Sequence, residues 1–116
     1  MKEIYIISTP IGNLKDITLR ALETLKNVDV ILCEDPKHHV KLLNYFNIKG
    51  KKLLKITSSN EKNSINGVIK LLEDGKKVAL VSNAGTPNIS DPGGEIVRLL
   101  WEKGVRCIPI PGPSSL

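Results

Sequence analysis

The sequence predicts an α/β domain with a mainly parallel sheet of five strands between layers of helices. Short apolar runs typical of buried strands alternate with longer segments whose apolar residues recur at helical spacing. Strands and helices that alternate in this way form parallel sheets with right-handed crossovers. The runs at 4–7 and 78–82 are almost wholly apolar, as expected where helices cover both faces of a sheet. We therefore expect a single three-layer domain.

The strand predictions fall on the ranges 4–7, 28–33, 53–56, 78–82 and 105–110. Pro109 lies inside the last range, which predicts an edge strand or an irregular end. The helices are expected on segments carrying Leu19, Ala21, Leu22 and Leu25, then Val40, Leu42, Leu43 and Phe46, then 63–73 and 94–102. Asp16 or Thr18 suits the start of the first helix, and Gly75 the end of the third.

Composition bounds the class of protein. The chain has 116 residues, enough for one domain, and 41% hydrophobic residues, too many for a disordered chain. The net charge of +5 would favour an encounter with nucleic acid, although surface lysines also serve solubility. Aromatic residues make up only 3%, which argues against a base-stacking platform. Cys33 and Cys107 lie in apolar runs and are expected to be buried, reduced thiols.

The start of the chain shows no signal-peptide pattern, and no apolar run is long enough to span a membrane. We therefore expect a soluble, cytoplasmic protein.

Three segments rich in glycine and proline follow the first, fourth and fifth expected strands, at 8–13, 81–93 and 111–115. The carboxyl ends of parallel strands meet at one end of a sheet, so these segments can converge on one ligand. None of them is a Walker loop or a G-x-G-x-x-G fingerprint, and no nucleophile triad is visible. The chemistry is therefore expected to belong to a bound small molecule that the protein positions.

Two carboxylates, Glu34 and Asp35, follow the second expected strand. A carboxylate in this position can hold a hydroxyl or act as a base. Alternatively, Asp35 caps a helix whose first residue is Pro36. His38 and His39 are neighbours that point in different directions, and no third ligand stands at metal spacing, so no metal site is expected.

Taken together, the glycine- and proline-rich segments resemble the tetrapyrrole methylase superfamily. The resemblance covers essentially the whole chain, and within the superfamily it is strongest to the branch that methylates the ribose 2′-hydroxyl of a cytidine in small-subunit ribosomal RNA. The residues that carry it are 9–14 with 16–22, 33–35 with 41–43, 81–93 and 109–114.

This resemblance implies a homodimeric S-adenosylmethionine-dependent methyltransferase with two domains and the methyl donor between them. Residues 1–116 would be the N-terminal domain, with the C-terminal domain absent from this chain, so the isolated chain is expected to be inactive. The implied partner is ribosomal RNA or the small ribosomal subunit, with no membrane and no metal. Glu34 and Asp35 are the candidate catalytic residues. The implied donor-binding residues are Pro10, Gly12, Ser82, Ala84, Gly85, Thr86, Ile89, Asp91, Pro111 and Gly112.

The chain departs from the family pattern at three places. Asn83 stands where Asp is usual, Pro36-Lys37 where Thr-Arg is usual, and Asn88 where Gly is usual. Asparagine adds hydrogen-bond donors and removes a charge, which puts any proton-handling role of that position in doubt. Lysine lacks the planar fork with which arginine grips a phosphate.

Three other functions stay open. A related methylase of a corrin or porphyrin would carry similar loops. A non-enzymatic RNA-binding remnant would bind RNA and no methyl donor. A signalling receiver would need an acidic pocket after the first strand and an aspartate ending the third, whereas those strands end in Ser8-Thr9 and Thr57.

Overall fold

The computed structural model describes residues 2–9, 14–57, 61–83 and 92–110 of the chain. Within them it has five strands, four α-helices and a short 3₁₀ helix at Leu14–Asp16. The strands are β1 (Glu3–Thr9), β2 (Val30–Cys33), β3 (Lys52–Lys55), β4 (Val78–Asn83) and β5 (Arg106–Ile110). The helices are α1 (Leu19–Asn27), α2 (Pro36–Tyr45), α3 (Glu61–Glu73) and α4 (Pro92–Glu102).

All five strands form one sheet in the order β3-β2-β4-β1-β5, and every neighbouring pair is parallel. This confirms the α/β class and the mainly parallel sheet. It also confirms the edge position of the strand that contains Pro109, because β5 pairs with β1 alone.

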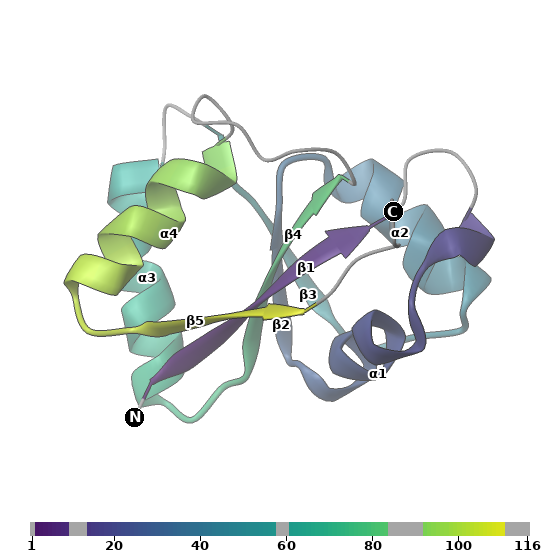
Figure 1. Cartoon of the computed structure of the whole chain (residues 1–116), viewed down its shortest axis with the longest axis horizontal. Helices are drawn as coiled ribbons and strands as arrows, with labels where there is room; N and C mark the ends of the chain where they lie inside the picture. The colour runs from purple at the N-terminus through teal and green to yellow at the C-terminus, as the bar shows by residue number, and fades with distance from the viewer. Residues whose placement is uncertain (1, 10–13, 58–60, 84–91, 111–116) are drawn as a thin grey trace.

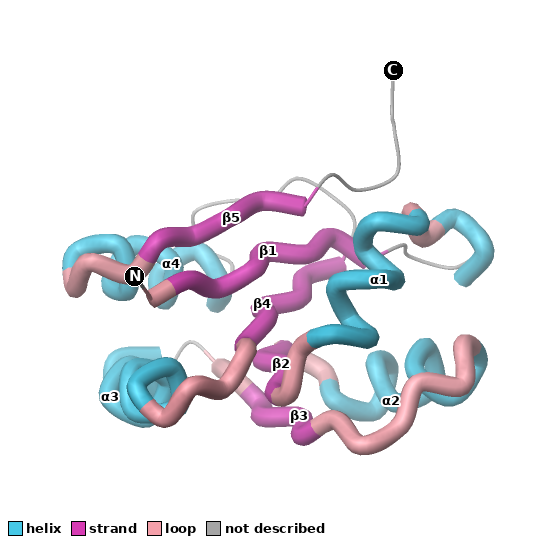
Figure 2. Tube along the Cα trace, turned by 90° about the horizontal axis from the view of Figure 1, so that it is seen from below, coloured by secondary structure: helices cyan, strands magenta, loops and turns pink. Residues whose placement is uncertain are grey.

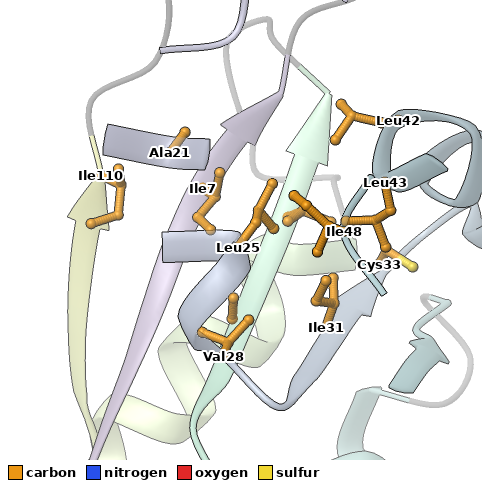
Figure 3. Close-up of a cluster of buried hydrophobic side chains, with 12 residues drawn as sticks. Ile7, Ala21, Leu25, Val28, Ile31, Cys33, Leu42, Leu43, Ile48 and Ile110 are labelled. Carbon is orange, nitrogen blue, oxygen red and sulfur yellow. The ribbon is translucent and has the colours of Figure 1, made fainter. Parts of the chain in front are cut away.

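Helices cover both faces of the sheet (Figures 1 and 2). On one face α1 and α2 close a core through Ala21, Leu25 and Leu42, which pack with Ile7 and Val81 of the strands (Figure 3). On the other face α3 and α4 close a second core, to which they contribute Ile65, Val68, Ile96 and Leu100. The three-layer prediction is therefore confirmed.

Adjacent residues of each central strand point into different cores, as the pleat of a strand requires. In β4, Ala79 and Val81 belong to the first core and Val78 and Leu80 to the second. This is why the sequence of that strand is apolar without alternation.

Several sequence-based boundaries differ from the structure by one or two residues. The second strand starts at Val30, because the Val28 amide donates to the Thr24 carbonyl (3.1 Å) and closes the last turn of α1. The third and fourth helices each start two residues earlier than expected, at Glu61 and Pro92. Proline is favoured in the first turn of a helix, which suits the start of α4.

Helix ends follow the expected signals. Thr18 caps α1: its Oγ1 accepts the Ala21 amide at 3.1 Å. Gly75 follows α3 with φ of 82°, and the amides of Gly75 and Lys76 donate back to the carbonyls of Leu72 and Leu71. This left-handed residue, the one expected to end α3, satisfies carbonyls that the helix itself leaves unpaired.

Some apolar residues assigned to buried helix faces are exposed. Leu19 is 78% exposed and Val40 is 41% exposed. Cys33 is buried, as expected, whereas Cys107 is only partly buried. No helix in the described ranges is both long and apolar enough to cross a membrane.

Candidate functional site

The ends of β4, β1 and β5 lie side by side at one end of the sheet, called here the carboxyl end. Thr9, the last residue of β1, is opposite Asn83, the last residue of β4. Ile110, the last residue of β5, is opposite Ile7 of β1. The strands that precede the three glycine- and proline-rich segments are thus neighbours that run in the same direction.

The connections that leave β1 and β4 go to opposite faces of the sheet. The chain passes from β1 to α1, which covers the first core, and from β4 to α4, which covers the second (Figure 1). In open α/β sheets, ligands bind beyond the carboxyl ends of the strands at the point where neighbouring connections diverge in this way. The ends of β1 and β4 are therefore the candidate ligand site.

Most of the implied donor-binding residues lie outside the described residues: Pro10, Gly12, Ala84, Gly85, Thr86, Ile89, Asp91, Pro111 and Gly112. Ser82 lies in β4, where its backbone pairs with Ser8 of β1. The convergence of the three segments therefore stays a prediction. The structure describes the strands that lead into them.

The candidate catalytic carboxylates follow β2, which is the neighbour of β4 on the side away from β1. Glu34 and Asp35 are both exposed, at the carboxyl end of the sheet. Both side chains are thus open to a ligand that approaches this end.

Asp35 occupies the N-cap position of α2 with Pro36 as the first helical residue, but its side chain makes no capping hydrogen bond. The alternative that Asp35 stands at the N-cap of a helix beginning at Pro36 is therefore confirmed in position, but without a side-chain capping bond. Its carbonyl oxygen is used instead, because it accepts both the His39 amide (3.4 Å) and His39 Nδ1 (3.0 Å). The carboxylate stays available for other contacts.

His39 is a buried polar residue. Since the Asp35 carbonyl can only accept, the proton of the neutral ring lies on Nδ1. Burial lowers the pKa of His39 from its ordinary value of 6.5, although the hydrogen bond to Asp35 opposes this shift. His39 is thus a neutral structural residue on the buried side of α2.

His38 contacts His39 edge to face, with ring centroids 5.2 Å apart. The neighbouring rings are therefore in contact, with their planes at 90°. His38 Nε2 is buried without a hydrogen-bond partner. The described residues contain no group of three potential metal-ligating side chains.

A depression of about 530 Å³ lies at the opposite, amino end of the sheet. Its lining includes Lys2 and Glu3 at the start of the chain, Glu73 at the end of α3, and Lys76 and Lys77 after that helix. The sequence analysis did not predict it. Its position away from the ends of β1 and β4 separates it from the candidate ligand site.

The fold and the diverging strand ends define a doubly wound α/β domain with a candidate ligand site at the carboxyl end of its sheet. The family described as Tetrapyrrole (Corrin/Porphyrin) Methylases matches residues 3–116. The chain therefore belongs to the tetrapyrrole methylase family, as its motifs indicate.

Curated relatives carry a more specific name. The ribosomal RNA small subunit methyltransferase I of Thermotoga maritima is 50% identical over 116 residues, which cover 100% of this chain and 52% of that protein. The protein of the same name from Escherichia coli O157:H7 is 47% identical over 113 residues, covering 97% of this chain and 39% of that protein. The chain thus spans about half the length, or less, of these relatives.

Solved structures of methyltransferases have the same fold. A cobalt precorrin-4 methyltransferase of cobalamin biosynthesis has a TM-score of 0.76 and 26% identity, over 97% of this chain and 46% of that one. A uroporphyrin-III C-methyltransferase from Thermus thermophilus has a TM-score of 0.72 and 23% identity, over 98% of this chain and 49% of that one. The latter likeness concerns the fold alone.

Proposed function

We propose that this chain is the donor-binding N-terminal part of an S-adenosylmethionine-dependent methyltransferase that modifies a cytidine ribose 2′-hydroxyl in small-subunit ribosomal RNA. The observation that carries the proposal is the 50% identity, over the whole chain, to a relative named for ribosomal RNA methylation. The adjacent, diverging ends of β1 and β4 support a ligand at the place where the donor is expected.

The position of the described strand ends supports a donor of this kind. The ends of β4, β1 and β5 can support one ligand along three neighbouring segments. Small residues such as Gly12, Gly85 and Gly112 allow backbone to approach that ligand closely. S-adenosylmethionine supplies an electrophilic methyl group on a sulfonium sulfur. The contribution of the chain is to align that group with the attacking ribose oxygen, and alignment of this kind lowers the barrier substantially.

Glu34 and Asp35 are proposed to face the substrate. Both carboxylates are exposed at the carboxyl end of the sheet, next to the end of β4. A carboxylate can accept a hydrogen bond from the ribose hydroxyl and take its proton as the new O–CH₃ bond forms and the S–CH₃ bond breaks. Asp35 is free for such a contact because its side chain does not cap α2.

The length of the relatives suggests how activity is divided. Because this chain matches about half of the Thermotoga protein, we propose that a second domain completes the donor pocket. We also propose, from the family resemblance, that the whole enzyme is a cytoplasmic homodimer. The chain alone is then expected to bind the donor weakly and to transfer no methyl group.

Calorimetry tests this division. S-adenosylmethionine is titrated into the 116-residue chain, with and without the C-terminal half of the Thermotoga relative. We expect weak donor binding by the chain alone and tighter binding when both parts are present. The Gly85→Val substitution is expected to abolish donor binding. Transfer of labelled methyl to small ribosomal subunits by the combined parts is expected to fall in Glu34→Gln or Asp35→Asn. Tight donor binding by the chain alone would contradict the proposed division.

A second candidate function is methylation of a small tetrapyrrole. It is favoured by the fold shared with a cobalt precorrin-4 methyltransferase at a TM-score of 0.76. Labelled methyl offered to both substrates separates the two, since incorporation into porphyrinoid precursors and none into ribosomal particles would establish it. RNA affinity without donor binding would instead favour a non-enzymatic RNA-binding remnant.

A further inference from the structure

The positive charge of the chain is concentrated in one segment. Residues 36–60 contain six lysines and no aspartate or glutamate. The rest of the chain holds 11 basic and 12 acidic residues, so the net charge of +5 arises entirely from this segment. The six are Lys37, Lys41, Lys49, Lys51, Lys52 and Lys55. Such asymmetry is the electrostatic pattern of a surface that meets a polyanion.

The described part of this segment, residues 36–57, forms one side of the molecule. It comprises α2 and β3, and β3 is the edge strand next to β2 (Figures 1 and 2). One of its lysines has a structural role: Lys51 Nζ donates to the carbonyls of Lys26 and Val28, each at 2.6 Å, at the end of α1. Lys37, Lys41, Lys49 and Lys52 are exposed. These four side chains are placed to attract an anion.

Two of these lysines line up with an aromatic side chain on α2. Lys37, Lys41 and Tyr45, named here the α2 row, stand four residues apart and therefore on one face of the helix. The buried residues of α2, His39, Leu42 and Leu43, lie on the other side. The α2 row is thus a solvent-facing line of two cations and one ring.

Tyr45 is 52% exposed, and its ring is held in place from one side. It meets Phe46 edge to face, with centroids 4.9 Å apart and planes at 83°. Phe46 in turn packs against the first core. A supported, exposed ring beside cations is the arrangement on which proteins stack the bases of single-stranded nucleic acid.

The α2 row also has a direction. Since α2 follows β2, Lys37 lies at the carboxyl end of the sheet, and Lys41 and Tyr45 lie progressively further from it. Glu34 and Asp35 stand just before Lys37 and would repel a phosphate, so a strand would meet the row beyond them. Lys52 of β3 lies beside an acidic residue, the exposed Asp29. The Lys52 amide donates to the Asp29 carbonyl at 3.1 Å.

We propose that the α2 row binds single-stranded RNA, with phosphates on Lys37 and Lys41 and one base stacked on Tyr45. An RNA strand bound in this way is led to the carboxyl end of the sheet, where the methyl donor is expected. The inference rests on the proposed function for the choice of RNA. The stacked ring distinguishes it from binding of an acidic protein, which would need the lysines alone.

Fluorescence anisotropy of the 116-residue chain with a short, fluorescein-labelled, cytidine-containing single-stranded RNA tests the row. Tyr45→Ala is expected to weaken binding about tenfold, within the range that loss of one stacked base causes, whereas Tyr45→Phe keeps the ring and the affinity. The matched control is Trp101→Ala, which removes the 65% exposed ring on α4 and should leave affinity unchanged.

Salt dependence tests the lysines. The double substitution Lys37→Gln with Lys41→Gln is expected to reduce the slope of log affinity against log salt by about 1.4, since each phosphate contact of a single strand contributes about 0.7. Lys70→Gln with Lys103→Gln removes the same charge from exposed positions outside the segment and serves as the control. Far-UV circular dichroism checks that every variant is folded.

Three results would overturn the inference: no RNA binding at low salt, equal effects of row and control variants, or equally tight binding to phosphatidylserine vesicles with the same dependence on the row. The test is separable from that of the proposed function. If donor binding and methyl transfer are observed and the α2 row variants bind RNA as tightly as the unsubstituted chain, only the proposal for the α2 row is refuted. If RNA binds through the α2 row and no donor binds, only the proposed methyltransferase function is refuted.

Discussion

At the scale of single residues, Thr18 gives α1 a measurable part of its stability. Its hydroxyl oxygen accepts a hydrogen bond from the Ala21 amide at 3.1 Å. Without this bond, that amide of the first turn would have no partner within the helix. Thr18→Ala is expected to lower the free energy of unfolding by about 1 kcal/mol. Urea denaturation measures this, with Thr18→Ser as the control that keeps the hydroxyl. Equal losses in both variants would show that the capping bond contributes nothing.

His39 makes stability depend on pH. Burial lowers its pKa in the folded chain below the ordinary value of 6.5, so below that value the unfolded chain binds more protons than the folded one. The contribution of His39 to the free energy of unfolding is therefore complete above pH 6.5 and is lost as the pH falls below that value. The urea midpoint is expected to drop as the pH falls below about 6.5, and to drop less in His39→Gln. An unchanged slope in that variant would assign the effect to other groups.

Thr18 and Asp35 mark the limit of sequence reasoning at this scale. Both stand directly before a helix and both are favoured cap residues. Only Thr18 caps, since the Asp35 side chain makes no such bond while its carbonyl accepts from His39. The choice depends on backbone and side-chain angles that neighbours in space determine, and a single sequence does not record them.

At the scale of elements, two glycines at α3 have opposite roles. Gly67 lies inside the helix, and Gly75 follows it with φ of 82°, while an added Cβ would meet nothing within 4 Å at either position. The backbone conformation at each glycine therefore decides how an alanine there changes the free energy of unfolding. Gly67→Ala is expected to raise the free energy of unfolding by about 0.5–1 kcal/mol. Gly75→Ala is expected to lower it by about 1–2 kcal/mol. Thermal denaturation of the two variants measures both changes. A shift of both melting temperatures in the same direction would contradict the prediction.

The elements were predictable because hydrophobic periodicity reflects which residues meet the sheet. All five strands and four helices occur where the apolar pattern indicated, with boundaries off by a few residues. Errors fell on residues at the border of a helix face: Leu19, the first residue of α1, is 78% exposed, and Val40 of α2 is 41% exposed. Whether such a residue is covered depends on neighbouring elements, and periodicity within one helix does not encode these.

At the scale of the whole molecule, the strand order β3-β2-β4-β1-β5 decides where the site lies. Alternation of strands and helices predicted that the glycine-rich segments leave from one end of the sheet. It did not predict that the three strands preceding them are immediate neighbours. The α2 row was missed for a related reason, because low aromatic content argued against base stacking while a single exposed ring, Tyr45, stands among lysines. The absence of acidic residues from 36 to 60 was the available signal.

The same strands line both cores, so the two sides of the molecule are expected to unfold together. Leu100 of α4 is fully buried in the second core, and Cys33 of β2 is fully buried in the first. Leu100→Ala leaves a cavity that costs about 2–5 kcal/mol, a large share of the 5–15 kcal/mol typical of a domain. Loosening the strands from one face should therefore expose a thiol on the other.

Alkylation of Cys33 at about pH 8 reports this coupling. Burial, with the nearby charge of Asp35, raises the pKa of Cys33 to about 11, so in the native chain the thiol is both covered and protonated. Labelling then requires opening of the first core. Leu100→Ala is expected to speed labelling by roughly the factor by which it raises the equilibrium constant of unfolding, whereas Trp101→Ala, on the exposed side of the same helix, leaves the rate unchanged. Unaltered labelling of Cys33 in a destabilised Leu100→Ala chain would mean that the two faces open independently.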